Sequence, residues 1–313
     1  MHTHSYRNII AALLLLAVAS CGKPEMGSRP LVVTSIPPLG DWIAAVGGDA
    51  IDVLVLVPPA SSPHTFELTP GQLREASRAS LVVLNGAGLE FWSDRLIENL
   101  RNPKTPVLRL SDGVALLQTG TDTHAHDTHG EAAHGHNAHG HGTHGHGTEG
   151  NPHFWLDPVV ADSAVGRIAT ALIRILPEAR DSIIARTSAY QRELRRLDAD
   201  IVRAAATWSS SRFIGDHASW SYFARRYGLE EAGVIEELPG REISAREMAG
   251  LIRLMRDRDI QAVFADARKS TRAADILREE TGARIALLDP LGDEGGYIGL
   301  MRFNLEAIDR VLR

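Results

Sequence analysis

Short apolar runs rich in β-branched residues recur along the chain, and they constrain its fold more than any other feature. Stretches with helical signals separate them, and near-continuous apolar strands that alternate with helices are typical of a parallel sheet covered on both faces. The runs form two sets, at 31–36, 53–57, 81–86 and 106–110, then at 212–216, 233–238, 262–266 and 284–289. The sequence therefore predicts an α/β protein with two lobes, each a roughly four-stranded parallel sheet with flanking helices.

One long amphipathic segment separates the two sets of strands. It begins at Pro177, a favourable first helical position, and extends to residue 208. Apolar residues recur along it at steps of three and four, which predicts one buried helix face: Ile183, Ile184, Tyr190, Leu194, Leu197, Ile201 and Trp208. Such a helix would extend ~48 Å, at ~1.5 Å per residue. We therefore expect one long rigid helix at 177–208 that joins an N-terminal lobe at 31–176 to a C-terminal lobe at 209–313.

Local signals mark where other helices begin. Thr69 is a candidate N-cap, Pro70 suits the first helical position, and Gln72 would complete a capping box. Ser244 is a second candidate cap, with Glu247 three residues further on. Two further helices are expected at 89–100 and 158–176.

The first 21 residues have the pattern of a targeting segment. Arg7 precedes an apolar run at 9–20, which is too short to span a bilayer but suits a signal peptide. The run ends at Cys21, the only cysteine, in a sequence that resembles a bacterial lipobox; a plain signal peptide is the alternative. The sequence thus predicts a periplasmic or cell-surface protein, lipid-anchored to the membrane through Cys21 and a polar tether at 22–30. A mature protein with no other cysteine has no disulfide, and its metal ligands must be His, Asp or Glu.

A low-complexity insertion at 118–150 interrupts the pattern of strands and helices. It has no apolar periodicity, and we expect it to be disordered. Two interpretations stay open, an accessory loop that collects or senses metal weakly and a plain spacer. The insertion holds nine of the 14 histidines: His124, His126, His129, His134, His136, His139, His141, His144 and His146.

Only three histidines remain in the predicted folded body, and all three lie in loops. His64 follows the second predicted strand, His153 precedes a helix, and His217 follows a strand of the second lobe. Asp289 ends the last predicted strand. Ligands of open α/β sheets bind beyond the carboxyl ends of the strands, where these residues are expected. Three imidazoles and one carboxylate would make a four-coordinate site that suits Zn²⁺.

Two acids near these histidines allow more than one interpretation. Glu67 and Asp157 are candidate acceptors for imidazole N–H groups, and a surface acid and a helix cap are the alternatives. Nearby aromatic residues are predicted to be core side chains: Trp92, Phe154, Trp155 and Trp220.

Five motifs in order carry a resemblance to a known family. They read PHTFELTPGQL, NGAGLEFW, NPHFWLDP, DHASWSYFARRYGL and LDPLGDEGGYIGLMRFNLEAI, and they are spread over essentially the whole mature chain. The chain resembles the metal-binding solute-binding lipoproteins of ABC importers, of the ZnuA/TroA type and its zinc-binding branch. That resemblance implies a non-enzymatic, monomeric receptor that captures Zn²⁺ in the cleft between the lobes and delivers it to an ABC-transporter permease.

The resemblance also implies a set of metal ligands. The family's first, second and third ligand positions fall on His64, His153 and His217, and the fourth falls on Asp289. In some zinc-binding members, water or a loop carboxylate completes the shell instead. The chain departs from the family in two places: FADARKS replaces a turn that resembles Glu-Pro-Gln, and an acidic residue, Asp216, precedes the third histidine where the family usually has one after it.

Other functions fit the sequence less well. A formal net charge of −6 and the lack of a basic stripe argue against a nucleic-acid-binding protein. Three histidines with an open fourth position could serve a metallohydrolase, but neither an HExxH motif nor a nucleophile elbow is present in the sequence. A receptor for manganese or another divalent metal, and a surface adhesin, stay as alternatives, although no sequence feature favours adhesion.

Overall fold

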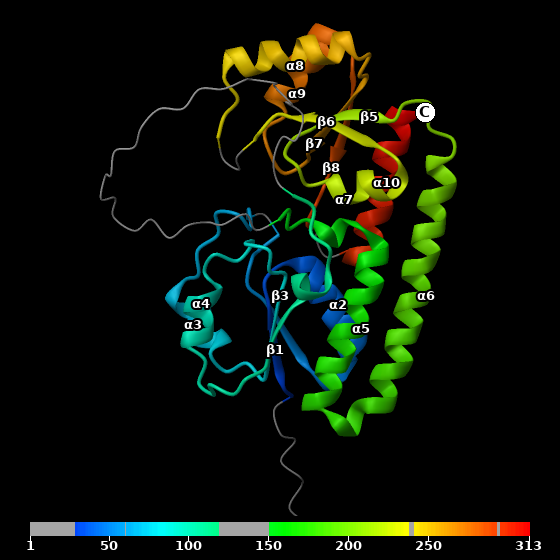
Figure 1. Cartoon of the computed structure of the whole chain (residues 1–313). Coiled ribbons are helices and arrows are strands. Elements are labelled where there is room, and N and C mark those ends of the chain that lie inside the picture. The colour runs from blue at the N-terminus through cyan, green and yellow to red at the C-terminus, as the bar shows by residue number, and fades with distance from the viewer. Residues whose placement is uncertain (1–28, 60, 119–149, 238–240, 293–294) are drawn as a thin grey trace, which may run out of the picture.

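The computed structural model describes residues 29–59, 61–118, 150–237, 241–292 and 295–313. Its described part contains two parallel four-stranded sheets, as the sequence predicts, and helices lie on both sides of them (Figure 1). The targeting segment, Cys21, most of the tether and the nine clustered histidines lie outside the described residues. No helix in the described ranges has the length and apolar character that crossing a bilayer requires.

The N-terminal sheet has the strand order β2-β1-β3-β4. Its strands are β1 (Leu31–Thr34), β2 (Asp52–Val55), β3 (Leu81–Leu84) and β4 (Val107–Arg109). Its helices are α2 (Pro37–Gly47), α3 (Pro70–Ala76), α4 (Ser93–Glu98) and α5 (Pro158–Ile175). The order places β1 and β3 in the middle of the sheet, and the side chains of Val32, Val33 and Val82 are fully buried.

The C-terminal sheet repeats the plan with the order β6-β5-β7-β8. Its strands are β5 (Arg212–Gly215), β6 (Glu230–Val234), β7 (Ala262–Asp266) and β8 (Arg284–Leu288). Its helices are α7 (Ser221–Tyr227), α8 (Ala245–Asp257), α9 (Arg272–Thr281) and α10 (Gly296–Leu312).

The long central helix is present, although it is shorter than the sequence suggests. A 3₁₀ turn occupies Pro177–Ala179, and α6 then extends from Arg180 to Ala205. The predicted buried face is confirmed at Ile183, Leu194 and Ile201. The prediction is wrong at Ile184, which is 43% exposed. The helix runs beside both lobes, packing against α2 and α5 of the first and α10 of the second (Figure 1).

Both predicted capping boxes form. Thr69 Oγ1 accepts a hydrogen bond from the Gln72 backbone N–H at 3.2 Å, and Gln72 Oε1 accepts one from the Thr69 N–H at 3.1 Å. Ser244 and Glu247 make the same reciprocal pair at the start of α8. Each box satisfies backbone donors that a helix N-terminus leaves unpaired.

Three further elements differ from the sequence-based expectation. The helix predicted at 89–100 is present only as the shorter α4, at Ser93–Glu98. The strand predicted at 233–238 begins three residues earlier, as β6 at Glu230–Val234, and a register irregularity interrupts its pairing with β5. No element was predicted at Pro37–Gly47, where the structure has α2. This helix begins with two prolines and is buried along most of its length, so it shows no alternation of polar and apolar faces.

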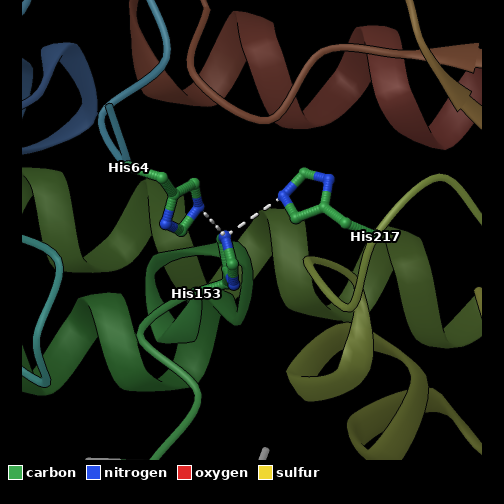
Figure 2. Close-up of side chains that lie close together, drawn as sticks. All are labelled: His64, His153 and His217. Atoms are coloured by element: carbon green, nitrogen blue, oxygen red, sulfur yellow. Dashed lines mark hydrogen bonds between the residues drawn. The ribbon is translucent and has the colours of Figure 1, made fainter. Parts of the chain in front are cut away.

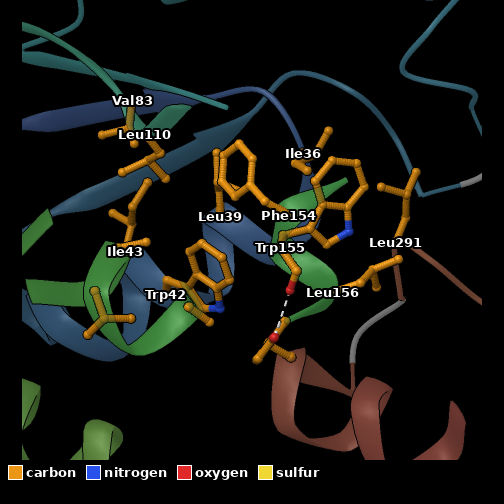
Figure 3. Close-up of a cluster of buried hydrophobic side chains, with 14 of the residues drawn as sticks. Ile36, Leu39, Trp42, Ile43, Val83, Leu110, Phe154, Trp155, Leu156 and Leu291 are labelled. Carbon is orange, nitrogen blue, oxygen red and sulfur yellow. Dashed lines mark hydrogen bonds between the residues drawn. The ribbon is translucent and has the colours of Figure 1, made fainter. Parts of the chain in front are cut away.

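One hydrophobic cluster extends through both lobes. It joins Trp42 and Phe154 of the first lobe to Phe213, Phe264 and Tyr297 of the second. The part of it around η3 (Phe154–Leu156) packs between the N-terminal sheet and Leu291 of the second lobe (Figure 3). A smaller, separate cluster lies beneath α8 and α9. Full burial of an aliphatic or aromatic side chain contributes ~1.5–3 kcal/mol, so the shared cluster holds the lobes together strongly.

Hydrogen bonds reinforce this junction. The Trp155 indole N–H donates to the Pro290 carbonyl at 2.7 Å, and the Tyr297 hydroxyl donates to the Trp155 carbonyl at 2.7 Å. Asp41 Oδ2 accepts from the Tyr190 hydroxyl at 2.8 Å and from the Tyr297 backbone N–H at 2.9 Å. Together they join η3, α2, α6 and the start of α10 into one network.

Candidate metal centre

The three histidines of the folded body meet where the two lobes face each other. His64 comes from the loop after β2, His153 immediately precedes η3, and His217 follows β5. The His64 and His217 Nε2 atoms lie 3.0 Å and 3.3 Å from His153 Nε2. Each ring offers one nitrogen, and these three nitrogens lie within 4.8 Å of one another (Figure 2). A single ion could contact all three.

His153 is held in one orientation by Asn151. The Asn151 side-chain oxygen accepts hydrogen bonds from the His153 backbone N–H at 2.9 Å and from the ring Nδ1 at 2.8 Å. The Asn151 amide nitrogen donates to the Ala218 carbonyl at 2.6 Å, which fixes the orientation of the amide. His153 Nδ1 therefore carries the proton, and its Nε2 lone pair points to the other two rings. This is the tautomer that binds a metal through Nε2.

His217 has a carboxylate on the other side of its ring. Asp216 Oδ2 lies 3.4 Å from His217 Nδ1, and both residues are largely buried. Acceptance of the Nδ1–H by a carboxylate leaves Nε2 free for a metal and fixes the orientation of the ring. The acid that precedes the third histidine can thus orient it despite the altered order of the motif.

Burial keeps two of the rings neutral. Desolvation, with smaller contributions from His217 and Lys269, lowers the pKa of His64 to about 4. Desolvation followed by the charges of His217 and His64 holds the pKa of His153 well below its ordinary value. Neutral imidazoles are the form that coordinates metal, so these rings are ready to bind at neutral pH.

The donor set and its location invite comparison with known proteins. The family model described as "ZnuA: Zinc-uptake complex component A periplasmic" matches residues 32–311. The chain belongs to the ZnuA family. This is a family of solute-binding proteins and not of enzymes.

Individual ZnuA-like proteins align over most of the chain. It is 28% identical over 315 residues to the high-affinity zinc uptake system protein ZnuA of Bacillus subtilis, covering 96% of this chain and 95% of that protein. It is 25% identical over 312 residues to the zinc-binding lipoprotein AdcA of Streptococcus pneumoniae, covering 96% of this chain but 59% of that longer protein. A crystal structure of ZnuA superposes with a TM-score of 0.76 and 30% identity, covering 91% of this chain and 100% of the other.

Asp289 has a different environment from the three histidines. Among the described residues, the group that could hold a metal consists of the three histidines and does not include Asp289. Asp289 Oδ1 accepts backbone hydrogen bonds from Leu291 at 2.9 Å and Gly292 at 3.0 Å, and it lies 3.2 Å from Arg268 Nε. The prediction that Asp289 is the fourth ligand stays a prediction. Metal binding would require Asp289 Oδ1 to give up these partners, or Oδ2 to rotate toward the ion.

The two acids with open roles are also placed. Asp157 Oδ1 accepts from the Val159 and Val160 backbone N–H groups, so it caps α5, and the carboxylate pairs with Arg226 at 2.8 Å. Glu67 is exposed, and no interaction with a histidine ring is described for it. The helix-cap interpretation therefore fits Asp157 better, and the surface-acid interpretation fits Glu67 better.

The sequence analysis did not predict the role of Asn151, although its place two residues before His153 could have suggested a partner for the ring.

Proposed function

We propose that this protein captures Zn²⁺ between its lobes with His64, His153 and His217 and delivers it to the permease of an ABC importer. The observation that carries the proposal is the convergence of three imidazole nitrogens within 4.8 Å. Membership of the ZnuA family supports the transport role, because the family is described as part of a zinc-uptake complex. ATP would be hydrolysed by a separate subunit.

The donor set favours zinc. Three imidazoles leave one position of a tetrahedral shell for water or for Asp289, and structural and catalytic zinc sites commonly have this form. Manganese prefers more oxygen ligands, so a manganese receptor is the less favoured alternative. The His64 loop is the part of the site that we expect to adjust, since the hydrogen bonds of Trp155 and Tyr297 oppose wide separation of the lobes.

The proposal includes the residues that the structure does not describe. Residues 1–21 are proposed to be a signal peptide, Cys21 the site of a lipid anchor, and 22–30 a tether. The name of the AdcA relative and the family description support a periplasmic or surface location. We propose that the nine histidines of the insertion at 118–150 collect zinc weakly near the site. The lobe boundaries are proposed at 31–176 and 209–313, with the linking helix at 177–208.

A competitive titration tests the proposal. Purified protein beginning at residue 22, with and without 118–150, is titrated with Zn²⁺ against a chelator of known affinity and then with Mn²⁺. We expect one tight Zn²⁺ site that persists without the insertion and that His64→Ala weakens by ~100-fold or more, in line with the loss of one of the ligands. Glu67→Ala, on the same loop but exposed, is the matched control. Tight Mn²⁺ binding without tight Zn²⁺ binding would exclude the zinc assignment, and a tight site unaffected by His64→Ala would exclude the ligand assignment.

A further inference from the structure

Two consecutive cations, Arg268 and Lys269, follow β7 at the end of the sheet that carries His217. They belong to the FADARKS segment, where the sequence departs from the family pattern. Both side chains are partly buried, and between them they pair with four carboxylates, of which Asp216 also contacts His217: Asp216, Glu236, Asp266 and Asp289.

Lys269 bridges two of these acids. Its Nζ lies 2.8 Å from Asp216 Oδ2 and 2.7 Å from Glu236 Oε2. The side chains of Asp216 and Glu236 are 13% and 20% exposed, so little water is available to replace the ammonium group. Asp216 Oδ2 is also the oxygen that faces His217 Nδ1. Lys269 thus holds the carboxylate directly beside a proposed metal ligand.

Arg268 occupies the other two acids. Its Nη2 lies 3.0 Å from Asp266 Oδ2, and its Nε lies 3.2 Å from both Asp266 Oδ1 and Asp289 Oδ1. Its Nη1 donates to the Pro59 carbonyl at 3.1 Å, in the loop that leads to His64. Arg268 therefore engages Asp289, the residue at the family's fourth ligand position, and at the same time contacts the other lobe.

The positive charge of Lys269 also acts electrostatically on the histidine cluster. It contributes to the lowered pKa values of His64 and His153, after burial and the neighbouring histidines. A cation so placed has two effects on an entering metal ion. It repels every divalent ion, and it removes carboxylate oxygens from the set of donors that an ion could recruit.

The second effect differs between metals. Zn²⁺ is satisfied by imidazole nitrogens in a four-coordinate shell, whereas Mn²⁺ and Mg²⁺ prefer carboxylate oxygens and more ligands. We propose that Lys269, assisted by Arg268, is a specificity-determining residue, an inference that rests on the proposed function. By pairing with the neighbouring carboxylates it keeps them from binding a metal, and so restricts the site to ions that three imidazoles can hold. In this role Lys269 acts through Asp216 and Glu236 and does not touch the metal.

The ratio of Zn²⁺ to Mn²⁺ affinity measures this role. Loss of the charge alone would strengthen binding of both ions, and only release of oxygen donors would change their ratio. Lys269→Met keeps the length of the side chain and removes its charge. We expect Mn²⁺ affinity to rise and the Zn²⁺ preference to fall by about tenfold or more, with an electron paramagnetic resonance spectrum of bound Mn²⁺ that the unaltered protein lacks at the same concentrations.

Matched variants separate this role from a general effect on folding. Lys104→Met, at an exposed site in the N-terminal lobe, is expected to leave the ratio unchanged. Lys269→Arg keeps the charge and is expected to keep the preference. The triple variant Lys269→Met/Asp216→Asn/Glu236→Gln lacks both carboxylates that Lys269 holds. Arg268 still holds Asp266 and Asp289 in this variant, and we expect the variant to recover the preference for Zn²⁺.

Two results would overturn the inference. One is a ratio of Zn²⁺ to Mn²⁺ affinity in folded Lys269→Met that stays within about twofold of the ratio in the unaltered protein. If Lys269→Met does not fold, the same criterion applies to Lys269→Gln, which keeps a hydrogen-bond donor for one carboxylate. The other is an equal fall of the preference in the triple variant. Neither result affects the zinc assignment, which fails only if the unaltered protein lacks a tight Zn²⁺ site that depends on His64 and His153.

Discussion

The buried, neutral state of His64 predicts how the metal-free protein responds to acid. Its pKa is about 4 in the folded protein, against 6.5 for an ordinary histidine. Between these values the unfolded chain binds a proton at this position and the folded protein does not. The contribution of neutral His64 to the free energy of unfolding is therefore fully present above pH 6.5 and is lost as the pH falls towards the pKa in the folded protein.

The size of the loss follows from the two pKa values. Between about pH 8 and about pH 5, linkage gives a loss of about 2 kcal/mol for His64 alone, and the full loss below pH 4 approaches about 3 kcal/mol. The side chain is largely buried, so solvent screening reduces these values little. A loss of 2 kcal/mol is a large fraction of the stability of a typical domain.

The measurement compares unaltered protein with His64→Gln, which has no titrating ring at this position. Urea unfolding followed by tryptophan fluorescence, with a chelator present, gives the free energy of unfolding at both pH values. We expect the unaltered protein to lose about 2 kcal/mol more than the variant over this interval. Thr65→Ala, an exposed neighbour, serves as the control and should behave as the unaltered protein does. Equal losses in the unaltered protein and His64→Gln would refute the assignment of a depressed pKa.

Three further outcomes are expected. Asn151→Ala removes the acceptor for His153 Nδ1 and should weaken Zn²⁺ binding by about 10- to 100-fold in a chelator competition, while a change of less than threefold would argue against the orienting role. Tyr297→Phe leaves the buried Trp155 carbonyl without this donor and should reduce the free energy of unfolding by about 1–2 kcal/mol in urea, a cost that disappears if another donor replaces it. Thr69→Ala breaks the capping box of α3 and should cost about 1 kcal/mol in the same assay, whereas an unchanged midpoint would show that the cap does not contribute.

The sequence predicted those parts of the fold that depend on local patterns. Seven of the eight strands lie within the predicted ranges or within one residue of them, because strands buried on both faces are continuous apolar runs. The exception, β6, begins with Glu230 and Glu231, whose polar side chains hide the start of an edge strand. The helix α2 has no polar face to reveal its period, and its prolines and glycines resemble a loop.

The site required information that is not local. His64 and His217 are brought together by packing of two lobes, and their association could be predicted only from the ends of the strands and from the family resemblance. The partners of Asp289 could not be predicted, since its contact with Arg268 depends on how the turn after β7 meets the end of β8. The direction in which an imidazole is held also depends on residues such as Asn151, whose role emerges only from the folded geometry.

The shared hydrophobic cluster determines how the molecule comes apart. Phe213 and Phe264 of one lobe belong to the same packed unit as Trp42 and Phe154 of the other. Neither lobe can therefore melt without exposing apolar surface of its neighbour, and calorimetry of the metal-free protein should show a single cooperative transition in place of two. For the same reason, a chain divided within α6 would yield two halves that each expose the apolar side chains of the shared cluster. We expect such halves to aggregate or to be proteolysed, and not to bind metal as separate receptors.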